Sequence, residues 1–199
     1  MAQSFYRQAK FLISVANLSQ LPDDEGYEVA FVGRSNAGKS SALNVLTHQK
    51  DLAYTSKTPG RTQLINLFEL DDERRLVDLP GYGYAKVSHQ TKDSWAVLID
   101  DYLRERHCLK GIVILIDIRH PWQHFDQQIL DWAGIVNLPV HILLTKADKL
   151  NFGPRKSEFL KISSKIKLLA GDIDIQLFSA LTKEGVEVLS DKLDKWFAI

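Results

Sequence analysis

Short apolar runs recur along the chain and alternate with longer stretches in which apolar residues have helical spacing. Most of the short runs lack a polar face, which is typical of strands covered on both sides of a sheet. They predict strands at residues 29–32, 62–70, 75–78, 111–117, 140–144 and 173–178.

The intervening stretches predict helices. Within residues 88–107, Trp95, Leu98, Ile99 and Tyr102 lie three and four positions apart and therefore share one helical face. Further helices are predicted at residues 38–47, 122–134, 154–170 and 183–197. Because strands alternate with helices, we expect an α/β fold, a doubly wound, mostly parallel six-stranded sheet with helices on both faces.

Residues 1–27 do not follow this alternation. They hold a short apolar piece at residues 11–16, followed by a polar stretch that ends at Gly26. At 199 residues the chain has the length of one domain. We therefore expect an N-terminal extension, residues 1–27, that packs on a single domain formed by residues 28–199.

Composition narrows the class of protein. Hydrophobic residues make up 45% of the chain and charged residues 25%, which are ordinary globular values. The lone Cys108 excludes an internal disulfide framework and a cysteine-rich zinc site. The longest later apolar run, residues 112–116, is too short to span a bilayer. We expect a soluble cytoplasmic protein without a membrane partner.

Charge limits the mode of any nucleic-acid binding. The 25 Lys and Arg residues are balanced by 25 Asp and Glu residues. A nucleic-acid contact would therefore depend on a local basic patch.

The strongest chemical signal is the segment from Gly33 to Ser40, Gly-Arg-Ser-Asn-Ala-Gly-Lys-Ser, which lies between a predicted strand and a predicted helix. It matches the phosphate-binding loop G-x-x-x-x-G-K-[ST] in the context that the motif requires. The glycines allow successive backbone N–H groups to point inward around phosphate oxygens. Lys39 can reach the β- and γ-phosphates, and the Ser40 hydroxyl can coordinate Mg²⁺.

The base is indicated by Thr145-Lys146-Ala147-Asp148, directly after the apolar run at residues 140–144. A carboxylate at this place can accept the N1–H and the exocyclic N2–H of guanine, whereas adenine would leave it unpaired. The stem of Lys146 can lie across the base. Taken alone, Asp148 could equally cap the next helix, but downstream of a phosphate-binding loop the guanine interpretation is favoured.

Asp78-Leu79-Pro80-Gly81 follows the strand at residues 75–78. We expect the Asp78 carboxylate to hold Mg²⁺ through water and the Gly81 N–H to contact the γ-phosphate. Asp117 competes for the magnesium role because it also ends an apolar run, but it lacks the adjacent Pro-Gly turn.

Position alone suggests two further contacts. Thr62 precedes a predicted strand and could supply a second hydroxyl ligand to Mg²⁺, with Thr55 and Thr58 as weaker alternatives. Ser179-Ala180 follows the last predicted strand, where the Ala180 N–H could bond the guanine O6.

These elements in this order resemble the Ras-like GTPases, and four strings narrow the resemblance to the EngB (YihA/YsxC) family of bacterial GTPases. The strings are residues 33–44, GRSNAGKSSALN; 59–63, PGRTQ; 78–85, DLPGYGYA; and 117–121, DIRHP. The resemblance extends from about Phe11 to the C-terminus. It implies a P-loop G domain at residues 28–199.

The resemblance also implies the activity and the site. The family is associated with assembly of the large ribosomal subunit and, through it, with growth, cell division and septation. Its members bind and hydrolyse GTP with Mg²⁺. The implied nucleotide contacts are Gly33, Arg34, Ser35, Asn36, Ala37, Gly38, Lys39, Ser40, Gly60, Arg61, Thr62, Gln63, Leu64, Asp78, Leu79, Pro80, Gly81, Thr145, Lys146, Ala147, Asp148, Phe178, Ser179 and Ala180. Mg²⁺ ligation is implied for Ser40 and Thr62, and catalytic roles for Lys39, Asn36 and Thr62.

Tyr82 stands where Ras-like enzymes carry the glutamine that orients the attacking water. Its side chain either contributes to the reaction or packs away from the phosphate. We therefore expect slow intrinsic hydrolysis that a partner accelerates. In related bacterial GTPases an Asn at the position of Asn36 helps to hold a monovalent cation, which predicts a preference for K⁺ over Na⁺.

Residues 47–62 and 81–86 are the expected switch segments, which the γ-phosphate would order. The predicted helix at residues 154–170 carries five basic residues and a single acidic residue, Glu158. The five are Arg155, Lys156, Lys161, Lys165 and Lys167; Lys50, Lys57, Arg61 and Lys86 in the switch segments could extend the same side. Such helix faces are usually plain solvated surface, but this one could contact rRNA.

The expected partner is accordingly the immature large ribosomal subunit, its rRNA and its proteins, and the expected state is a monomer. Two alternatives remain open from the sequence. One is a module that holds GTP or GDP with negligible turnover, and the other is a P-loop kinase or ATPase.

Overall fold

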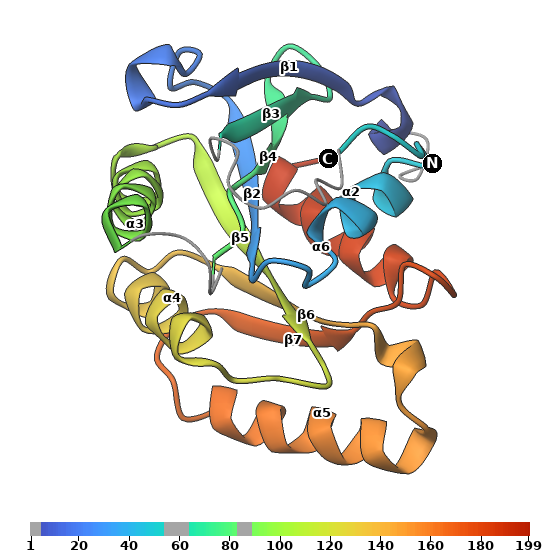
Figure 1. Cartoon of the computed structure of the whole chain (residues 1–199). Coiled ribbons are helices and arrows are strands. Elements are labelled where there is room, and N and C mark those ends of the chain that lie inside the picture. Colours follow the sequence, from blue (N-terminus) through green and yellow to red (C-terminus); the bar gives the residue numbers. More distant parts are fainter. Residues whose placement is uncertain (1–4, 54–63, 83–88) are drawn as a thin grey trace.

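A computed structural model describes residues 5–53, 64–82 and 89–199, with the backbone alone at 89–96. Its described part is built around a seven-stranded sheet with the order β1-β3-β4-β2-β5-β6-β7 (Figure 1). The strands are β1 (Lys10–Val15), β2 (Tyr27–Gly33), β3 (Ile65–Glu69), β4 (Arg74–Asp78), β5 (Leu109–Asp117), β6 (Val140–Thr145) and β7 (Ile173–Leu177). The helices are α2 (Lys39–Leu46), α3 (His89–Glu105), α4 (His124–Ile135), α5 (Phe152–Ile166) and α6 (Val186–Phe197), with short 3-10 turns η1 (Tyr6–Gln8), η2 (Leu18–Gln20) and η3 (Ala147–Lys149).

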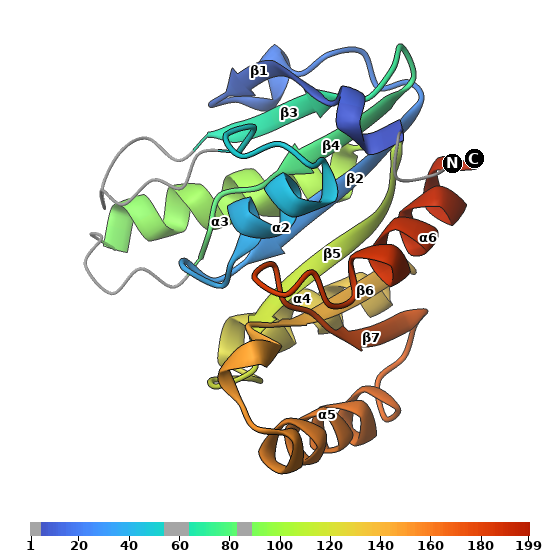
Figure 2. The ribbon, with the colours of Figure 1, turned by 90° about the vertical axis from the view of Figure 1, so that its right-hand side faces the viewer.

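The sheet is mostly parallel and is covered on both faces, as expected for a doubly wound α/β fold. Strands β4, β2, β5, β6 and β7 pair in parallel, and β3 is antiparallel to β4. Side chains alternate along each central strand, so that in β5 Ile112 and Ile114 join the core under α3, α4 and α5. Val113 and Leu115 join the opposite core under α2 and α6 (Figures 1 and 2). This two-sided cover explains why the strands lack a polar face.

The sheet has seven strands in the described residues, not the expected six, because residues 10–15 form the edge strand β1. This strand pairs antiparallel with β3 and carries an irregularity between Phe11 and Ile13. Its first three residues are exposed, so the run has no regular alternation that would mark it as a strand. Tyr6, just before it, is buried, and its hydroxyl donates a hydrogen bond to Asp194 Oδ1 in α6 at 2.6 Å.

The parallel strands place several loops at one edge of the sheet. Strands β2, β4, β5, β6 and β7 run in the same direction, so their carboxyl ends lie side by side. In open α/β sheets this edge is where ligands bind. Of the helices that the structure describes, none has the length and apolar character needed to cross a membrane.

Candidate functional site

The loop between β2 and α2 has the strand-loop-helix context that its motif demands. The Ala37 N–H donates to the Arg34 carbonyl at 2.9 Å, and Gly38 adopts a φ of +97°, a conformation that favours glycine. A Cβ on Gly33 would lie 2.7 Å from the Leu115 carbonyl oxygen, so the first glycine is also required. The chain can therefore curl tightly between the end of β2 and the first turn of α2.

Lys39 and Asp78 meet at this loop. The Lys39 ammonium forms an ion pair with Asp78 Oδ1, and both side chains are largely buried. Lys39 and Ser40 lie in the first turn of α2, where backbone N–H groups and the helix dipole favour an anion. The Ser40 hydroxyl and the Asp78 carboxylate are oxygen ligands of the kind that Mg²⁺ prefers. This set of donors fits a magnesium-bound phosphate group.

The segment after β4 lies directly along the phosphate loop. The Tyr82 N–H donates to the Gly33 carbonyl at 3.2 Å, and the Ser35 N–H donates to the Tyr82 carbonyl at 2.8 Å. A Cβ on Gly81 would lie 3.3 Å from the Ser35 nitrogen. Glycine at position 81 therefore permits this close approach, which places the Gly81 peptide beside the predicted phosphate site.

The side chain of Tyr82 points toward α4. Its ring is 1% exposed, and its hydroxyl donates to Asp126 Oδ1 at 2.5 Å. The Tyr82 side chain therefore packs, which is the second of the two sequence alternatives. Asp126 belongs to no motif and was missed in the sequence, although its spacing from Gln123 is that of a capping box at the start of α4.

The end of β6 is fastened to the phosphate loop. The Thr145 hydroxyl donates to the Ala37 carbonyl at 2.6 Å. The Lys146 ammonium donates to the Asn36 carbonyl at 2.6 Å and pairs with Asp117 Oδ2 at 2.9 Å. The segment Thr145–Asp148 and the phosphate loop, more than a hundred residues apart in the chain, thus form one unit.

Asp148 lies in η3 and is held by the loop after β7. The Ser179 hydroxyl donates to Asp148 Oδ1 at 2.7 Å, and Lys149 Nζ lies 3.2 Å from Oδ2. The hydrogen bond from Ser179, aided by Lys149, lowers the pKa of Asp148, so its carboxylate is charged at neutral pH. The N-cap position of α5 is Asn151, so Asp148 does not cap that helix.

Asp117, the alternative magnesium ligand, pairs with Arg119 and Lys146, whereas Asp78 pairs with Lys39. Arg119 Nη2 lies 2.7 Å from Asp117 Oδ2, and Lys146 shares the same oxygen. Burial acts to raise the pKa of Asp117, but hydrogen bonds from Arg119 and Lys146 hold it well below its usual value. Asp117 therefore positions Lys146, while Asp78 is the carboxylate that contacts the lysine of the phosphate loop.

The described part of the sequence-predicted site gathers at one edge of the sheet. Residues 33–40, 78–81, 145–148 and 178–180 are joined by backbone and side-chain hydrogen bonds. The Ala147 N–H donates to the Phe178 carbonyl at 3.1 Å, which links the last two segments. Leu64 lies immediately before β3. The predicted contacts at 60–63, including Thr62, and the switch residues at 54–62 and 83–86 lie outside the described residues.

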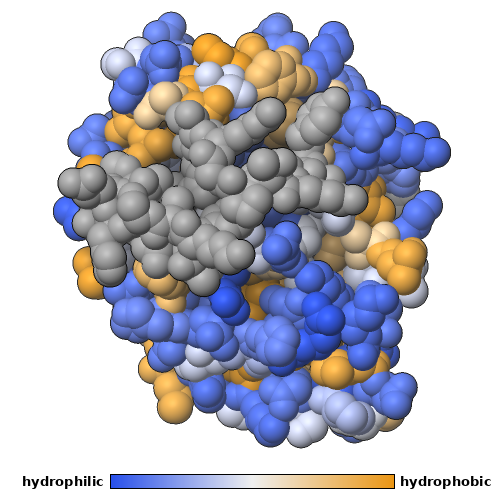
Figure 3. Space-filling view, in the orientation of Figure 1, coloured by the Kyte–Doolittle hydropathy of each residue, from blue (hydrophilic) through white to orange (hydrophobic). Residues whose placement is uncertain are grey.

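The predicted basic helix, observed as α5, is partly neutralised. Arg155 pairs with Glu184 at 2.9 Å, and Lys161 pairs with Glu158 at 2.6 Å. In Figure 3 hydrophilic residues cover much of the face that carries α5, and hydrophobic residues form small separate patches. This face is largely polar, with a smaller positive excess than the sequence suggests.

The amino-acid sequence is similar to those of known proteins. A protein-family profile described as "50S ribosome-binding GTPase" matches residues 28–146. The probable GTP-binding protein EngB of Edwardsiella ictaluri (strain 93-146) is 56% identical over 193 residues, which are 97% of this chain and 89% of that protein.

Two solved structures have a similar fold. A crystal structure of a probable GTP-binding protein EngB has a TM-score of 0.66 and 18% identity, covering 86% of this chain and 98% of that one. A structure of Era in complex with MgGDPNP and nucleotides 1506–1542 of 16S ribosomal RNA has a TM-score of 0.62 and 26% identity, covering 86% of this chain and 57% of that one.

Proposed function

Because the chain belongs to the EngB family of GTP-binding proteins and contains a GTPase domain, we propose that it is a GTP-gated switch in assembly of the large ribosomal subunit. The observation that carries the proposal is the set of hydrogen bonds between the phosphate loop and the segment Thr145–Asp148. Thr145 and Lys146 tie the Asp148 segment to the phosphate loop, so one rigid unit can hold a base and its phosphates together.

Each part of this edge has a separate task in the proposal. The phosphate-loop amides and Lys39 hold the phosphates, and Asp148 reads the guanine base. Ser40 and Asp78 would hold Mg²⁺, with Thr62 as the further predicted ligand. A Mg²⁺ ion held by these residues would supply positive charge that offsets the charge of the phosphates in the reaction of GTP with water to give GDP and phosphate.

We propose that intrinsic hydrolysis is slow. The Tyr82 hydroxyl donates its hydrogen bond to Asp126 and is therefore directed toward α4. The protein then lacks a residue at this position to orient the attacking water, and a partner would have to accelerate the reaction. The position of Asn36 in the phosphate loop supports a cation role, and we expect faster hydrolysis in K⁺ than in Na⁺.

The proposed partner is the immature large ribosomal subunit. The description of the matching family profile names 50S binding, and Lys156 and Lys165 of α5, with Lys167 just after the helix, would make the phosphate contacts. The protein would act as a monomer and, through ribosome supply, would support growth and cell division.

Co-sedimentation tests this proposal. Purified protein is run with large ribosomal subunits on sucrose gradients with a non-hydrolysable GTP analogue, with GDP and without nucleotide, at low and physiological salt. We expect association with the analogue that survives physiological salt. Equal, weak association in every nucleotide state that disappears with salt would contradict a specific ribosomal role.

A binding module with negligible turnover is the second candidate. The hydrogen bond from Tyr82 to Asp126 favours it, because this bond directs the tyrosine hydroxyl away from the attacking water. Multiple-turnover phosphate release with Mg²⁺ separates the two. Release that stops after one equivalent, with or without large subunits, would favour the binding module.

A further inference from the structure

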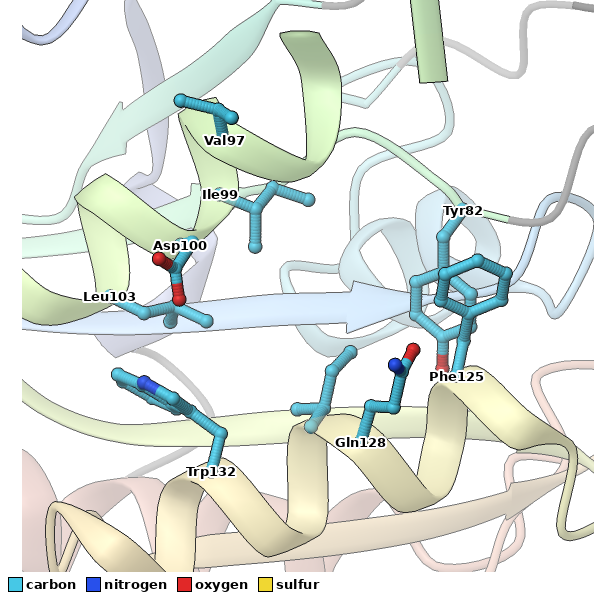
Figure 4. Close-up of a pocket in the computed structure, with 9 residues that line it drawn as sticks. Tyr82, Val97, Ile99, Asp100, Leu103, Phe125, Gln128 and Trp132 are labelled. Carbon is cyan, nitrogen blue, oxygen red and sulfur yellow. The ribbon is translucent and has the colours of Figure 1, made fainter. Parts of the chain in front are cut away.

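In the loop that follows β4, Tyr82 forms hydrogen bonds in two directions, one set through its backbone and one through its side chain. The backbone of Tyr82 bonds to the phosphate loop through Gly33 and Ser35, at 3.2 and 2.8 Å. Its side chain points the other way, toward α4 (Figure 4), where its hydroxyl donates a hydrogen bond to Asp126 in the first turn. Tyr82 therefore links the phosphate loop to α4, and the Gly81 peptide is its immediate neighbour.

The hydrogen bond from Tyr82 to Asp126 is short, and its acceptor is a buried carboxylate with a second hydrogen-bond donor. Asp126 is fully buried, and its Oδ2 accepts the Gln123 N–H at 2.8 Å, so the carboxylate is held by the helix start. Burial raises the pKa of Tyr82 well above its usual value, which keeps the hydroxyl protonated as a donor. A short hydrogen bond to a buried carboxylate is costly to leave unmade.

The Tyr82 ring packs in the core beside an apolar cavity. Tyr82 and Phe125 line a cavity of about 430 Å³ between α3 and α4, together with Ile99, Leu103 and Trp132 (Figure 4). The ring centroids of Tyr82 and Phe125 are 5.8 Å apart. Tyr82 belongs to the buried core under α3, α4 and α5, so packing and the hydroxyl hydrogen bond together fix the position of the ring.

We propose that the Tyr82–Asp126 hydrogen bond is a latch that positions the Gly81 peptide for the γ-phosphate, which makes Tyr82 a positioning residue for discrimination between GTP and GDP. The inference rests on the proposed function. GDP has no γ-phosphate for Gly81 to contact, so the latch affects the triphosphate selectively. Holding the N–H donor in place before binding saves the cost of ordering it on binding.

The chain contains a matched control. The Tyr102 hydroxyl donates to Glu28 Oε2 at 2.8 Å, and both residues are fully buried. Glu28 is near the start of β2, whereas the phosphate loop follows the end of that strand. Y82F and Y102F each delete one oxygen from a buried tyrosine–carboxylate pair, and only Y82F alters the site edge.

The experiment measures dissociation constants for GDP and a non-hydrolysable GTP analogue in the wild-type protein, Y82F and Y102F, with thermal unfolding of each. We expect both variants to unfold at lower temperature. In Y82F the affinity for the analogue falls about fivefold relative to GDP, as the loss of one hydrogen bond predicts, and in Y102F the ratio stays at the wild-type value. A D126A/Y82F double variant should shift the ratio no further than Y82F, because the two residues act as one unit.

Three results overturn the latch. An unchanged ratio in Y82F, or an equal change in Y102F, makes the bond purely structural. If the ratio in Y82F is unchanged but its phosphate release from GTP, measured in parallel, is slower than in the wild type, the hydroxyl acts on hydrolysis and not on GTP binding. Failure of the wild-type protein to bind either nucleotide would contradict the proposed function itself, which separates the two failures.

Discussion

The proposed choice of guanine depends on the carboxylate of Asp148. It is held by Ser179 and stays charged at neutral pH, so it can accept two N–H groups from one base. An amide at this position would turn one acceptor into a donor. That donor would face the guanine N–H groups but would suit xanthine, which carries an oxygen in place of the exocyclic amine.

We therefore expect D148N to weaken GDP binding by about a hundredfold or more while gaining affinity for xanthosine diphosphate. Fluorescent-nucleotide displacement measures both affinities. D172N, at an exposed carboxylate before β7, is the control and should bind GDP as the wild type does. Retained guanine preference in D148N would show that another group reads the base.

Asp24 gives a residue-scale prediction about pH. Its carboxylate accepts the His107 N–H at 3.0 Å and the Cys108 N–H at 2.8 Å, which ties residues 22–26 to the end of α3. Burial acts to raise the pKa of Asp24, but these hydrogen bonds outweigh it and lower the pKa from 3.8 to about 2. The stabilisation is therefore fully present above the unfolded pKa and is lost as pH falls through about 2.

Urea unfolding at several pH values checks this sign. We expect D24N to be less stable than the wild type by roughly 1 kcal/mol at neutral pH, with the difference closing as the solution is acidified toward the folded-state pKa. A difference that stays constant into acid would mean that the carboxylate charge contributes nothing.

At the scale of elements, the N-terminal residues are built into the sheet. Strand β1 covers the edge of β3, and Tyr6 reaches α6 through Asp194. Removal of residues 1–16 would expose β3 as an edge strand and leave the half-buried carboxylate of Asp194 without its Tyr6 partner.

We expect the chain lacking residues 1–16 to unfold at a markedly lower temperature and to aggregate more readily than the full chain. Circular dichroism during heating and light scattering measure these effects. The variant Y6F, which keeps β1, should lose only a fraction of this stability. An unchanged melting temperature in the shortened chain would mean that residues 17–199 are stable without β1 and the residues before it.

Sequence patterns predicted the buried elements well and the edges poorly. The central strands and the helices α2 to α6 lie within a few residues of their expected places, because two-sided burial leaves a continuous apolar signal. Strand β1 was missed because its irregularity and exposed residues break the alternation. Motif spacing was enough to predict Lys39, Asp78 and Asp148 as residues of the candidate site. The Asp126 partner of Tyr82 was not, since it depends on a tertiary contact between segments without a shared motif.

At the scale of the whole molecule, the two ends of the central strands differ. The loop end carries the candidate site, while near the start of β2 the buried Glu28 accepts bonds from Tyr102 and Arg106. Arg106 Nη2 lies 2.8 Å from Glu28 Oε1, which fixes the end of α3 to the sheet. These bonds therefore tie the sheet to α3 at the end opposite the candidate site.

Ligand binding to the whole fold should appear as added stability. At a free GDP concentration of a hundred times Kd, the unfolding free energy should rise by about 2.7 kcal/mol, which is several degrees in Tm for a chain of this size. The same concentration of ADP should have no effect, because adenine would leave Asp148 unpaired. A shift of equal size with ADP would favour the kinase or ATPase alternative.

The hydrogen bond between Ser179 and Asp148 also has a consequence for synthesis. Residues 178–180 follow every other segment of the candidate site in the chain, and strand β7 just before them is an edge of the sheet. A growing polypeptide can thus form the phosphate loop early, yet the Asp148 carboxylate proposed to bind the base lacks Ser179 until the residues after β7 have left the exit tunnel. Guanine recognition would begin only once translation of the domain is nearly complete, so a stalled or prematurely released chain would not compete with the finished protein for GTP.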